Sequence, residues 1–303
     1  MDRVAHRVAN LLVGNNEGAA ALEATLIGPT VLFDEQTLIA LAGADLDATI
    51  DGSRVARWAP RLVPAGATLR FGRAVTGCRV SIAVAGGIEV PLVFGSRSTY
   101  LRAGFGGMDG RALRPGDVLE ARKPSRLSES IAASLRGGAH PMHGAWSAGA
   151  ALRPAYSGDA VVRLIEGAHT TELAPASRDA LTERRFRVSP SSDRMGYRLE
   201  GEALALRAPR EMLSEAVAFG TVQLPPGGAP IVLMADRQTT GGYPRIGEVA
   251  SVDLPLVAQL KPGDQLRFRM ISLAEAQQLF LELERDLAQA RLAIALRFPA
   301  NRH

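Results

Sequence analysis

The stretch VSIAVAGGIEVPLVF, residues 80–94, is the longest apolar run of the chain. A membrane-spanning helix needs about 20 apolar residues in succession, and this shorter run carries Glu89 and Pro91. Its β-branched residues and its Gly-Gly pair instead predict short strands that are interrupted by a tight turn. The run therefore indicates β-structure, and we expect no transmembrane segment and no role at a membrane.

The same pattern recurs on both sides of this run. Gly and Pro make up about one residue in six, and together with Asp they separate many short apolar segments. This arrangement is typical of a mainly β protein and not of alternating strands and helices. We expect strands within residues 21–28, 30–34, 37–43, 48–52, 67–72, 78–87, 90–95, 156–167, 221–237, 247–260 and 264–272.

A few helices accompany the strands. Residues 2–13 place Val4, Val8 and Leu11 on one face, which predicts an amphipathic helix. A capping box of Ser272 and Glu275 predicts the start of a long final helix, because each side chain can satisfy a free backbone amide. Two shorter helical stretches are expected at residues 174–183 and 210–220.

The domain organisation follows from a change in composition. Residues 126–153 are rich in Gly, Ala, Ser and Pro and lack a clear period, which predicts a linker or crossing segment. We therefore expect a first β domain over residues 1–125 and a second over 154–303 that includes the C-terminal helix. RPGDVL (114–119) and KPGDQL (261–266) hint at a repeat, although such turns are common enough to recur by chance.

The charge and cysteine content limit the possible partners. The net charge is +4, and the cationic residues are scattered among acids and are nearly all Arg, unlike the basic stripe of a nucleic-acid-binding protein. Arg can hold carboxylates or phosphates with two parallel hydrogen bonds. Cys78 is the single cysteine, so no internal disulfide forms; we expect a cytoplasmic protein in which Cys78 is buried as a small hydrophobic residue.

Several common catalytic motifs are missing from the sequence. No G-x-x-x-x-G-K-[ST] phosphate loop and no G-x-S-x-G nucleophile elbow occur. His140 and His143 are three residues apart in a loop rich in Gly and Pro, which favours a chance pair over a metal site. We expect no metal.

Three loops combine Gly, hydroxyl groups and Arg: residues 94–111, 189–201 and 235–249. Backbone amides, hydroxyls and guanidinium groups suit an anionic or carbonyl ligand. Equally, Arg–Asp pairs and Thr hydroxyls can merely hold turns in place. Spacing alone leaves both interpretations open.

The longest of these phrases carry a resemblance to a known family. GSRSTYLRAGFGG (95–107), SDRMGYRLEG (192–201), the stretch from GTVQLPP to RIGEV (220–249) and DLPLVAQLKPGD (253–264) resemble the biotin-dependent carboxyltransferase / allophanate hydrolase subunit 2 family. Its members include the C subunit of ATP-dependent 5-oxoprolinase, and KipA, the antagonist of KipI. Related domains occur in urea carboxylase.

The resemblance implies a cyclophilin-like fold of two tandem β-barrel-type domains. It implies a subunit of an ATP-dependent 5-oxoprolinase, which hydrolyses 5-oxoproline to L-glutamate together with a KipI-like (subunit 1) protein and a LamB/YcsF-type subunit. Alternatives are a KipA-like regulator that binds a KipI-like kinase inhibitor, and a carboxyltransferase subunit that acts on urea or a similar amide. ATP would be a co-substrate of the complex. No cofactor would be bound covalently, since neither Lys123 nor Lys261 lies in a Met-Lys-Met-type turn, so biotin would arrive on another protein.

Together with the three loops, the resemblance gives candidate site residues for an amide or lactam substrate. The catalytic candidates are Asp193, Arg194, Asp236 and Tyr243. The ligand-binding candidates are Ser96, Arg97, Thr99, Arg111, Arg198, Arg237, Thr239, Thr240, Gly241 and Gly242. Two stretches depart from the family. Its usual start, resembling pG..ttvQD.GR.G….SGAMD, is represented only by Met1-Asp2, and Gly247-Glu248 stands where an apolar or small pair is more usual.

Overall fold

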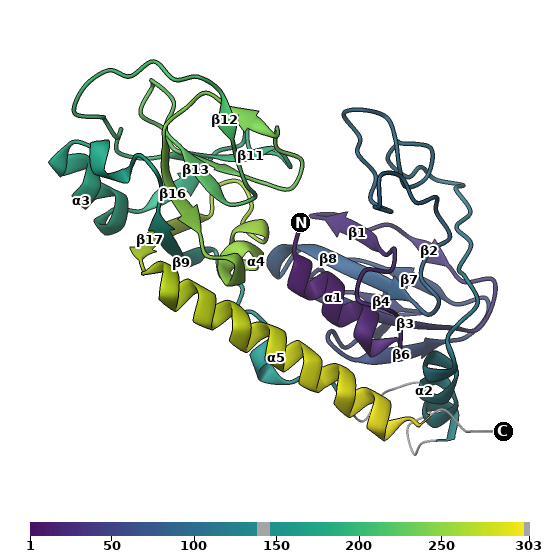
Figure 1. Ribbon diagram of the computed structural model, residues 1–303. Helices are drawn as coiled ribbons and strands as arrows, with labels where there is room; N and C mark the ends of the chain where they lie inside the picture. Colours follow the sequence, from purple (N-terminus) through teal and green to yellow (C-terminus); the bar gives the residue numbers. More distant parts are fainter. Residues whose placement is uncertain (138–145, 300–303) are drawn as a thin grey trace. The chain divides into compact units, whose positions relative to one another are not determined.

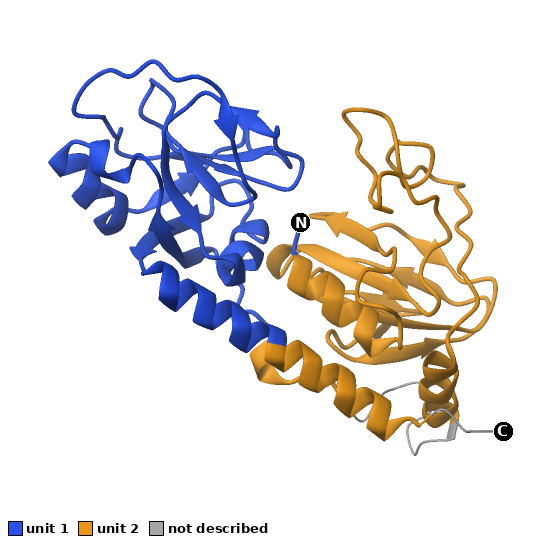
Figure 2. Ribbon diagram, in the orientation of Figure 1, with its two compact units in different colours: residues 1–2, 154–284 blue, residues 3–153, 285–303 orange. Residues whose placement is uncertain are grey.

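The computed structural model describes residues 1–137 and 146–299, and the chain divides into two compact units (Figure 2). Unit 1 consists of residues 1–2 and 154–284, and unit 2 of residues 3–153 and 285–303. Both are mainly β, as the sequence predicts. The final helix, α5 (Leu273–Arg297), has its first half in unit 1 and its second half in unit 2.

Unit 1 is built around a closed barrel of seven strands (Figure 1) in the order β10-β11-β14-β13-β16-β9-β17. The first strand, β9, and the last, β17, pair in parallel over six residues and close the barrel, whereas the other neighbours are antiparallel. The bounds are β9 (Asp159–Glu166), β10 (Phe186–Val188), β11 (Gly196–Glu200), β13 (Thr221–Gln223), β14 (Ile231–Leu233), β16 (Arg245–Val249) and β17 (Gln265–Met270).

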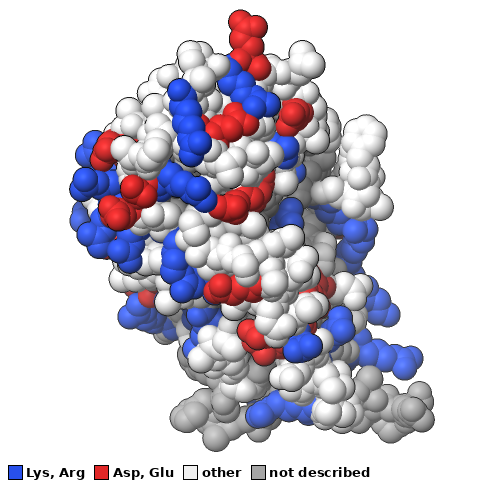
Figure 3. Space-filling view, turned by 60° about the vertical axis from the view of Figure 1, so that its left-hand side comes forward, with Lys and Arg blue, Asp and Glu red and all other residues white. Residues whose placement is uncertain are grey.

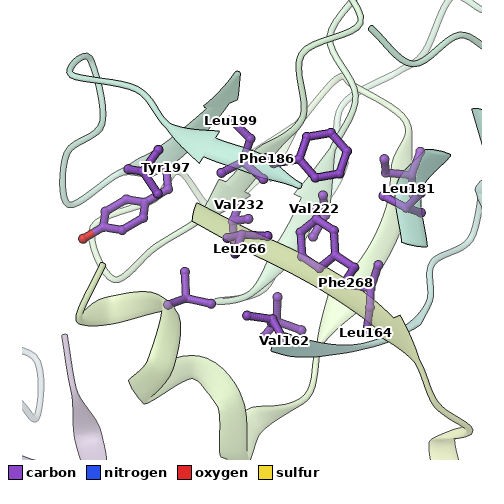
Figure 4. Close-up of a cluster of buried hydrophobic side chains, with 14 of the residues drawn as sticks. Val162, Leu164, Leu181, Phe186, Tyr197, Leu199, Val222, Val232, Leu266 and Phe268 are labelled. Atoms are coloured by element: carbon purple, nitrogen blue, oxygen red, sulfur yellow. The ribbon is translucent and has the colours of Figure 1, made fainter. Parts of the chain in front are cut away.

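The interior of the barrel is filled by alternate residues of its strands (Figure 4). Along β9, Val162 and Leu164 are fully buried while Val161 beside them is exposed, as a strand with one inward face requires. The rings of Phe186 and Phe268 lie 5.9 Å apart and are tilted by 48°. Removal of this apolar surface from water is the main force that holds the barrel together.

Short elements connect and cover the barrel strands. They are η2 (Thr170–Glu172), α3 (Pro175–Glu183), β12 (Glu215–Ala216), β15 (Thr240–Gly241), η3 (Ser251–Asp253) and α4 (Leu254–Ala258). The helix expected at 210–220 is wrong, because Glu215 and Ala216 pair with β15 instead. Residues 254–258 were expected within a strand but form α4, with Pro255 in the first turn, where its fixed φ favours a helix.

Unit 2 contains two four-stranded sheets with the orders β1-β8-β3-β6 and β2-β7-β4-β5. Nearly all of β3 is buried, and α1 contacts β3 and β8, as expected of the predicted helix 2–13. Cys78 lies buried in β8, as predicted. The bounds are α1 (Arg3–Leu12), β1 (Leu22–Thr25), β2 (Val31–Leu32), β3 (Thr37–Asp45), β4 (Thr49–Ile50), β5 (Ser53–Arg54), β6 (Pro60–Val63), β7 (Thr68–Arg70), β8 (Thr76–Val84), α2 (Arg126–Gly137) and η1 (Ala150–Leu152).

Two segments of unit 2 differ from the sequence prediction. The expected linker 126–153 begins with helix α2, whose first turn is capped by Ser125: its Oγ accepts the backbone N–H of Ser128 at 3.0 Å. Its buried residues Ile131 and Leu135 are four residues apart, as on one face of a helix. Two large apolar residues among many small ones were too few to predict this helix from the sequence. Residues 90–95 were expected as a strand but make only an isolated bridge between Val93 and Ser96.

The two Pro-Gly-Asp sequences form the same turn. Gly116 and Gly263 have φ of 92° and 91°, a left-handed conformation that Gly adopts readily. In one turn the carboxylate of Asp117 accepts the N–H of Arg114 at 2.7 Å, and in the other that of Asp264 accepts the N–H of Lys261 at 3.1 Å. Only the second leads into a strand, β17.

Candidate functional site

The loop 235–249 is fixed to the neighbouring loop 189–201 by an ion pair. The guanidinium of Arg194 donates to Asp236 through Nε at 3.0 Å and Nη2 at 3.2 Å. The backbone N–H of Asp236 donates to the carbonyl of Arg194 at 2.8 Å, and that of Arg237 to the carbonyl of Met234 at 3.3 Å. Two predicted catalytic candidates therefore contact each other, and their contact joins the two loops.

The remaining candidates in the loop 189–201 stabilise its turn. Asp193 Oδ1 accepts the N–H groups of Met195 and Gly196 at 2.8 and 3.2 Å, just before β11 begins. The side chain of Arg198 is exposed, and its backbone N–H donates to Ser192 Oγ at 3.1 Å. No part of this loop was expected to form a strand, yet residues 196–200 are β11.

The centre of the loop 235–249 forms a small hairpin with β12. Thr240 and Gly241 pair with Ala216 and Glu215, and the carbonyl of Thr239 accepts the N–H of Val217 at 3.0 Å. The side chains of Thr239 and Thr240 are exposed. Their hydroxyls therefore face solvent, where a ligand can reach them.

Gly241 is required by a close contact beneath the hairpin. A Cβ at this position would lie 2.4 Å from Nε2 of Gln223, whose side chain is buried. The same Nε2 lies 3.5 Å from the carbonyl oxygen of Tyr243, and the Tyr243 side chain is exposed. A Cβ on Gly242 would meet nothing closer than Ser214 Oγ at 3.6 Å. Gly242 is exposed and has no side chain, so a ligand can approach its backbone closely.

Beneath this hairpin lies a group of polar side chains, Thr221, Gln223, Arg245 and Glu248, which we call the barrel-wall cluster. Thr221 pairs with Glu248 and Gln223 with Arg245, across a bulge in the register of β13 and β16. Because Val222 points into the core, its two neighbours on β13 point to the opposite side of the strand. The pairing therefore gathers four polar side chains on the outer wall of the barrel.

Glu248 is the titratable centre of the barrel-wall cluster. Its carboxylate accepts a hydrogen bond from the Thr221 hydroxyl at 2.8 Å, and Thr221 Oγ1 accepts one from the N–H of Ala218 at 2.9 Å. Burial raises the pKa of Glu248, and the Thr221 hydrogen bond and the charge of Arg245 oppose this rise. Glu248 therefore holds its proton to a higher pH than an ordinary glutamate, which suits proton transfer.

Arg245 connects this cluster to its surroundings. Its Nη2 donates to Glu215 at 3.0 Å, and its backbone N–H donates to Nδ1 of the buried His169 at 3.0 Å. Because Nδ1 accepts this bond, the neutral imidazole carries its proton on Nε2. The buried Nε of Arg245 has no hydrogen-bond partner among the described residues.

The candidates of the loop 94–111 lie in unit 2. Arg111 donates to both oxygens of Asp117 at 2.8 and 2.9 Å, and this bond holds the pKa of Asp117 at about 2. Arg111 thus stabilises the first Pro-Gly-Asp turn. Ser96 Oγ accepts the N–H of Ser98 at 3.1 Å, and the side chain of Thr99 packs against Gly107. Arg97 is half-buried, and its Nε has no hydrogen-bond partner among the described residues.

The sequence interpretation missed Thr221, Gln223, Glu248 and His169 as members of the site. The signal for the first two was available: polar residues at alternate positions of a strand whose middle residue is apolar predict one polar face. The contributions of Glu248 and His169 depend on strand pairing and on a contact between distant segments. Neither is visible in local sequence.

A separate cavity of about 330 Å³ lies within unit 2, between α1, residues 146–152 and the second half of α5. Its lining is mostly apolar, with Arg297 as the charged member, and it includes none of the candidate residues. Titratable groups with shifted pKa values gather at functional sites, and burial raises the pKa of Glu248. We therefore take the barrel-wall cluster and its hairpin as the candidate site.

Neither metal ligands nor a membrane span emerge from the described residues. No group of three or more His, Cys, Asp or Glu side chains is arranged to hold a metal ion there, and His140 and His143 lie outside them. None of the helices described is long and apolar enough to cross a membrane. On the face shown in Figure 3, basic and acidic side chains are interspersed, without a stripe of one sign.

Comparison with known proteins gives one consistent family. The carboxyltransferase domain family, subdomains A and B, matches residues 1–270. The C subunit of 5-oxoprolinase from Haemophilus influenzae is 36% identical over 291 residues, which are 96% of this chain and 88% of that protein. The corresponding C subunit from Escherichia coli is 39% identical over 294 residues, covering 95% of this chain and 87% of that protein.

Solved structures agree with this assignment. The crystal structure of Kluyveromyces lactis urea carboxylase superimposes with a TM-score of 0.85 at 30% identity, over 96% of this chain and 26% of that one. The protein TTHA0988 superimposes with a TM-score of 0.71 at 34% identity, over 88% of this chain and 48% of its own. Both are longer proteins in which the same fold is one part.

Proposed function

Because the chain belongs to the carboxyltransferase domain family, subdomains A and B, we propose that it is a subunit of an ATP-dependent 5-oxoprolinase. The enzyme would hydrolyse 5-oxoproline to L-glutamate. The observation that carries the proposal is the match to the C subunits of two 5-oxoprolinases, at 36–39% identity over 87–88% of their length. The urea amidolyase of Lachancea kluyveri shares 31% identity, but over only 16% of that protein.

The proposed site is the hairpin of loop 235–249 together with the barrel-wall cluster. The Thr240 hydroxyl and the backbone at Gly241 and Gly242 would bind the carboxylate or the developing oxyanion of a lactam. Their support is exposure next to a glycine pair, which lets a ligand approach the backbone. Glu248 would hold or release a proton nearby, since burial raises its pKa.

The partners belong to the proposal as well. The relatives are named as subunits, and we propose a KipI-like protein and a LamB/YcsF-type protein as the other members of the complex. ATP would be a co-substrate of the complex, and this chain has no G-x-x-x-x-G-K-[ST] loop to bind it in that manner. Its single cysteine, which is buried, fits a cytoplasmic enzyme.

A carboxyltransferase acting on urea or a related amide is the second candidate function. The close superposition on urea carboxylase favours it. Biotin would then arrive on another protein, because Lys261 donates to Asp264 at 2.8 Å within its turn and serves the local structure. A lactam and a urea both present an electrophilic carbonyl bonded to nitrogen, so the same hairpin would serve both.

The test is ATP-dependent release of glutamate from 5-oxoproline by purified proteins. We expect activity only when this chain is combined with both partner proteins, and a clear loss with Thr240→Val at unchanged melting temperature. Thr182→Val, in α3 and away from the hairpin, is the matched control. If no mixture releases glutamate but a biotin carboxylase supports urea-dependent turnover, the second candidate is correct. A stable complex without any turnover would point to the regulatory role.

A further inference from the structure

Unit 2 carries an exposed apolar surface on one long loop, residues 92–118, drawn as coil between β8 and α2 in Figure 1. The ring of Phe94 is 93% exposed and that of Phe105 is 37% exposed. Four more large apolar residues of the same loop are exposed: Leu92, Leu101, Leu113 and Val118. The loop thus carries six exposed large apolar residues, and exposed apolar patches of this kind usually mark an interaction site.

This loop is stiffly built. The N–H of Tyr100 donates to the carbonyl of Phe105 at 2.9 Å, and that of Gly110 to the carbonyl of Gly106 at 2.9 Å. A Cβ on Gly106 would lie 2.3 Å from the carbonyl oxygen of Ser98, so the two arms of the loop touch through their backbones. A loop held in this way keeps its exposed side chains in fixed positions.

The aromatic side chains at its tip support one another. Phe94 and Phe105 meet edge to face, with centroids 5.7 Å apart, and Tyr100 meets Phe105 in the same manner at 5.5 Å. Phe94 also has φ of 49°, a left-handed conformation that is unfavourable for a bulky residue. Backbone strain beside an exposed aromatic ring suggests selection for binding, because neither feature stabilises the isolated chain.

The charges around this apolar surface define its complement. Arg111 and Asp117 form an ion pair, and the other charged residues of the loop are Arg97, Arg102 and Arg114 with a single acid, Asp109. The loop therefore carries a net positive charge. A partner that fits this surface would present an apolar pocket bordered by carboxylates. Two copies of the loop facing each other would bring like charges together, which disfavours self-association.

We propose that residues 92–118 dock another protein subunit of the same complex, with Phe94 and Phe105 as the anchoring side chains. This inference rests on the proposed function, since the relatives named as subunits imply further subunits. The solved relatives support a protein occupant: this chain spans 48% of TTHA0988 and 26% of the urea carboxylase. There the same fold is joined to further protein within one polypeptide.

The test is Phe94→Ser, measured by isothermal titration of the full chain with the purified KipI-like subunit and, separately, with the LamB/YcsF-type subunit. We expect at least a tenfold weaker Kd for one of them. The melting temperature of the isolated chain should fall only slightly, because Phe94 is 93% exposed and loses little besides its edge contact with Phe105. Ile27→Ser, a comparably exposed apolar residue of unit 2, is the matched control and leaves Kd unchanged. Arg97→Glu weakens the same interaction through its charge.

Three results would overturn this inference. The first is wild-type affinity of Phe94→Ser for both subunits. The second is a fall in melting temperature larger than loss of the Phe94–Phe105 edge contact explains, which would make the ring part of the chain's own packing. The third is a change from dimer to monomer in light scattering, which would make a second copy the occupant. The glutamate assay separates this inference from the proposed function. If Phe94→Ser weakens binding but the wild-type mixture releases no glutamate, the docking surface stands and only the proposed 5-oxoprolinase reaction is rejected.

Discussion

Replacing Thr221 with Val tests whether the hydrogen bonds of Thr221 in the barrel-wall cluster stabilise the folded barrel as strongly as their geometry predicts. Val keeps the shape of the fully buried side chain but removes the hydroxyl, which accepts the N–H of Ala218 and donates to Glu248. A neutral hydrogen bond contributes about 1 kcal/mol and one to a charged group about 1.5–3 kcal/mol. At a pH high enough to ionise native Glu248, the variant should therefore lose about 2.5–4 kcal/mol of unfolding free energy.

The loss should depend on pH in a defined direction. Burial raises the pKa of Glu248 above its ordinary value of 4.5, so the native state holds this proton more tightly than the unfolded state. Stability associated with Glu248 is then greatest below pH 4.5 and falls as the pH rises through the native pKa. At pH 4 Glu248 is protonated and both lost bonds are neutral, so the cost of Thr221→Val should shrink to about 2 kcal/mol.

Hydrogen exchange in increasing urea measures this effect within one unit. Peptides from β9 to β17 report the unfolding of the barrel, and peptides from β1 to β8 are the internal reference. Thr239→Val, which changes an exposed side chain, should cost less than about 0.5 kcal/mol. A loss below about 0.5 kcal/mol for Thr221→Val, or an equal loss at pH 4 and pH 8, would refute the reasoning.

Three further perturbations test other parts of the structure. Gly247→Ala would place a Cβ 2.5 Å from Leu164 in the core and should cost about 1–3 kcal/mol in thermal unfolding, whereas Gly227→Ala, with open space around it, should be nearly neutral. Asp117→Asn should speed hydrogen exchange in residues 111–118 at pH 7. The pKa of Asp117 is about 2 in the folded protein, below the usual value of 3.8, so its carboxylate stabilises the turn above pH 3.8. The difference in exchange rate between variant and wild type should fade as the pH drops toward 2. Arg194→Lys breaks the two-point contact with Asp236. It should lower the free energy of unfolding by only about 0.5–1.5 kcal/mol at this half-exposed position, but should lower glutamate release several-fold. Unchanged turnover would show that the contact between the two loops is unimportant for activity.

Sequence patterns within one segment predicted the strands and helices that are determined mainly by neighbouring residues. The apolar segment expected as a strand within residues 156–167 contains β9. The Ser272–Glu275 capping box marked the start of α5, where the N–H of Glu275 donates to Ser272 Oγ at 3.1 Å. The helix expected at 210–220 failed because Glu215 and Ala216 gain a strand partner about 25 residues away, and tertiary pairing overrides a weak helical pattern.

The site was predicted less completely for the same reason. The loop 235–249 was selected by its composition, and Arg194 and Asp236 were named separately as catalytic candidates. Their contact with each other was not predicted. The pairing of Thr221 with Glu248 depends on a bulge between β13 and β16, which no residue spacing within either strand reveals. Arg111 was expected to bind a ligand, but its partner Asp117 lies six residues away in a turn that its own side chain stabilises.

The parallel pairing of β9 with β17 also constrains how the protein is made. β9 pairs with β17, which lies about a hundred residues later in the chain. Almost the whole of unit 1 must therefore leave the ribosome before the barrel can close. Such long-range closure is slow because its entropy cost precedes the gain from pairing. During synthesis the unpaired edge of β9 stays open to other chains, and a chaperone that shields it at this stage would raise the yield of folded protein.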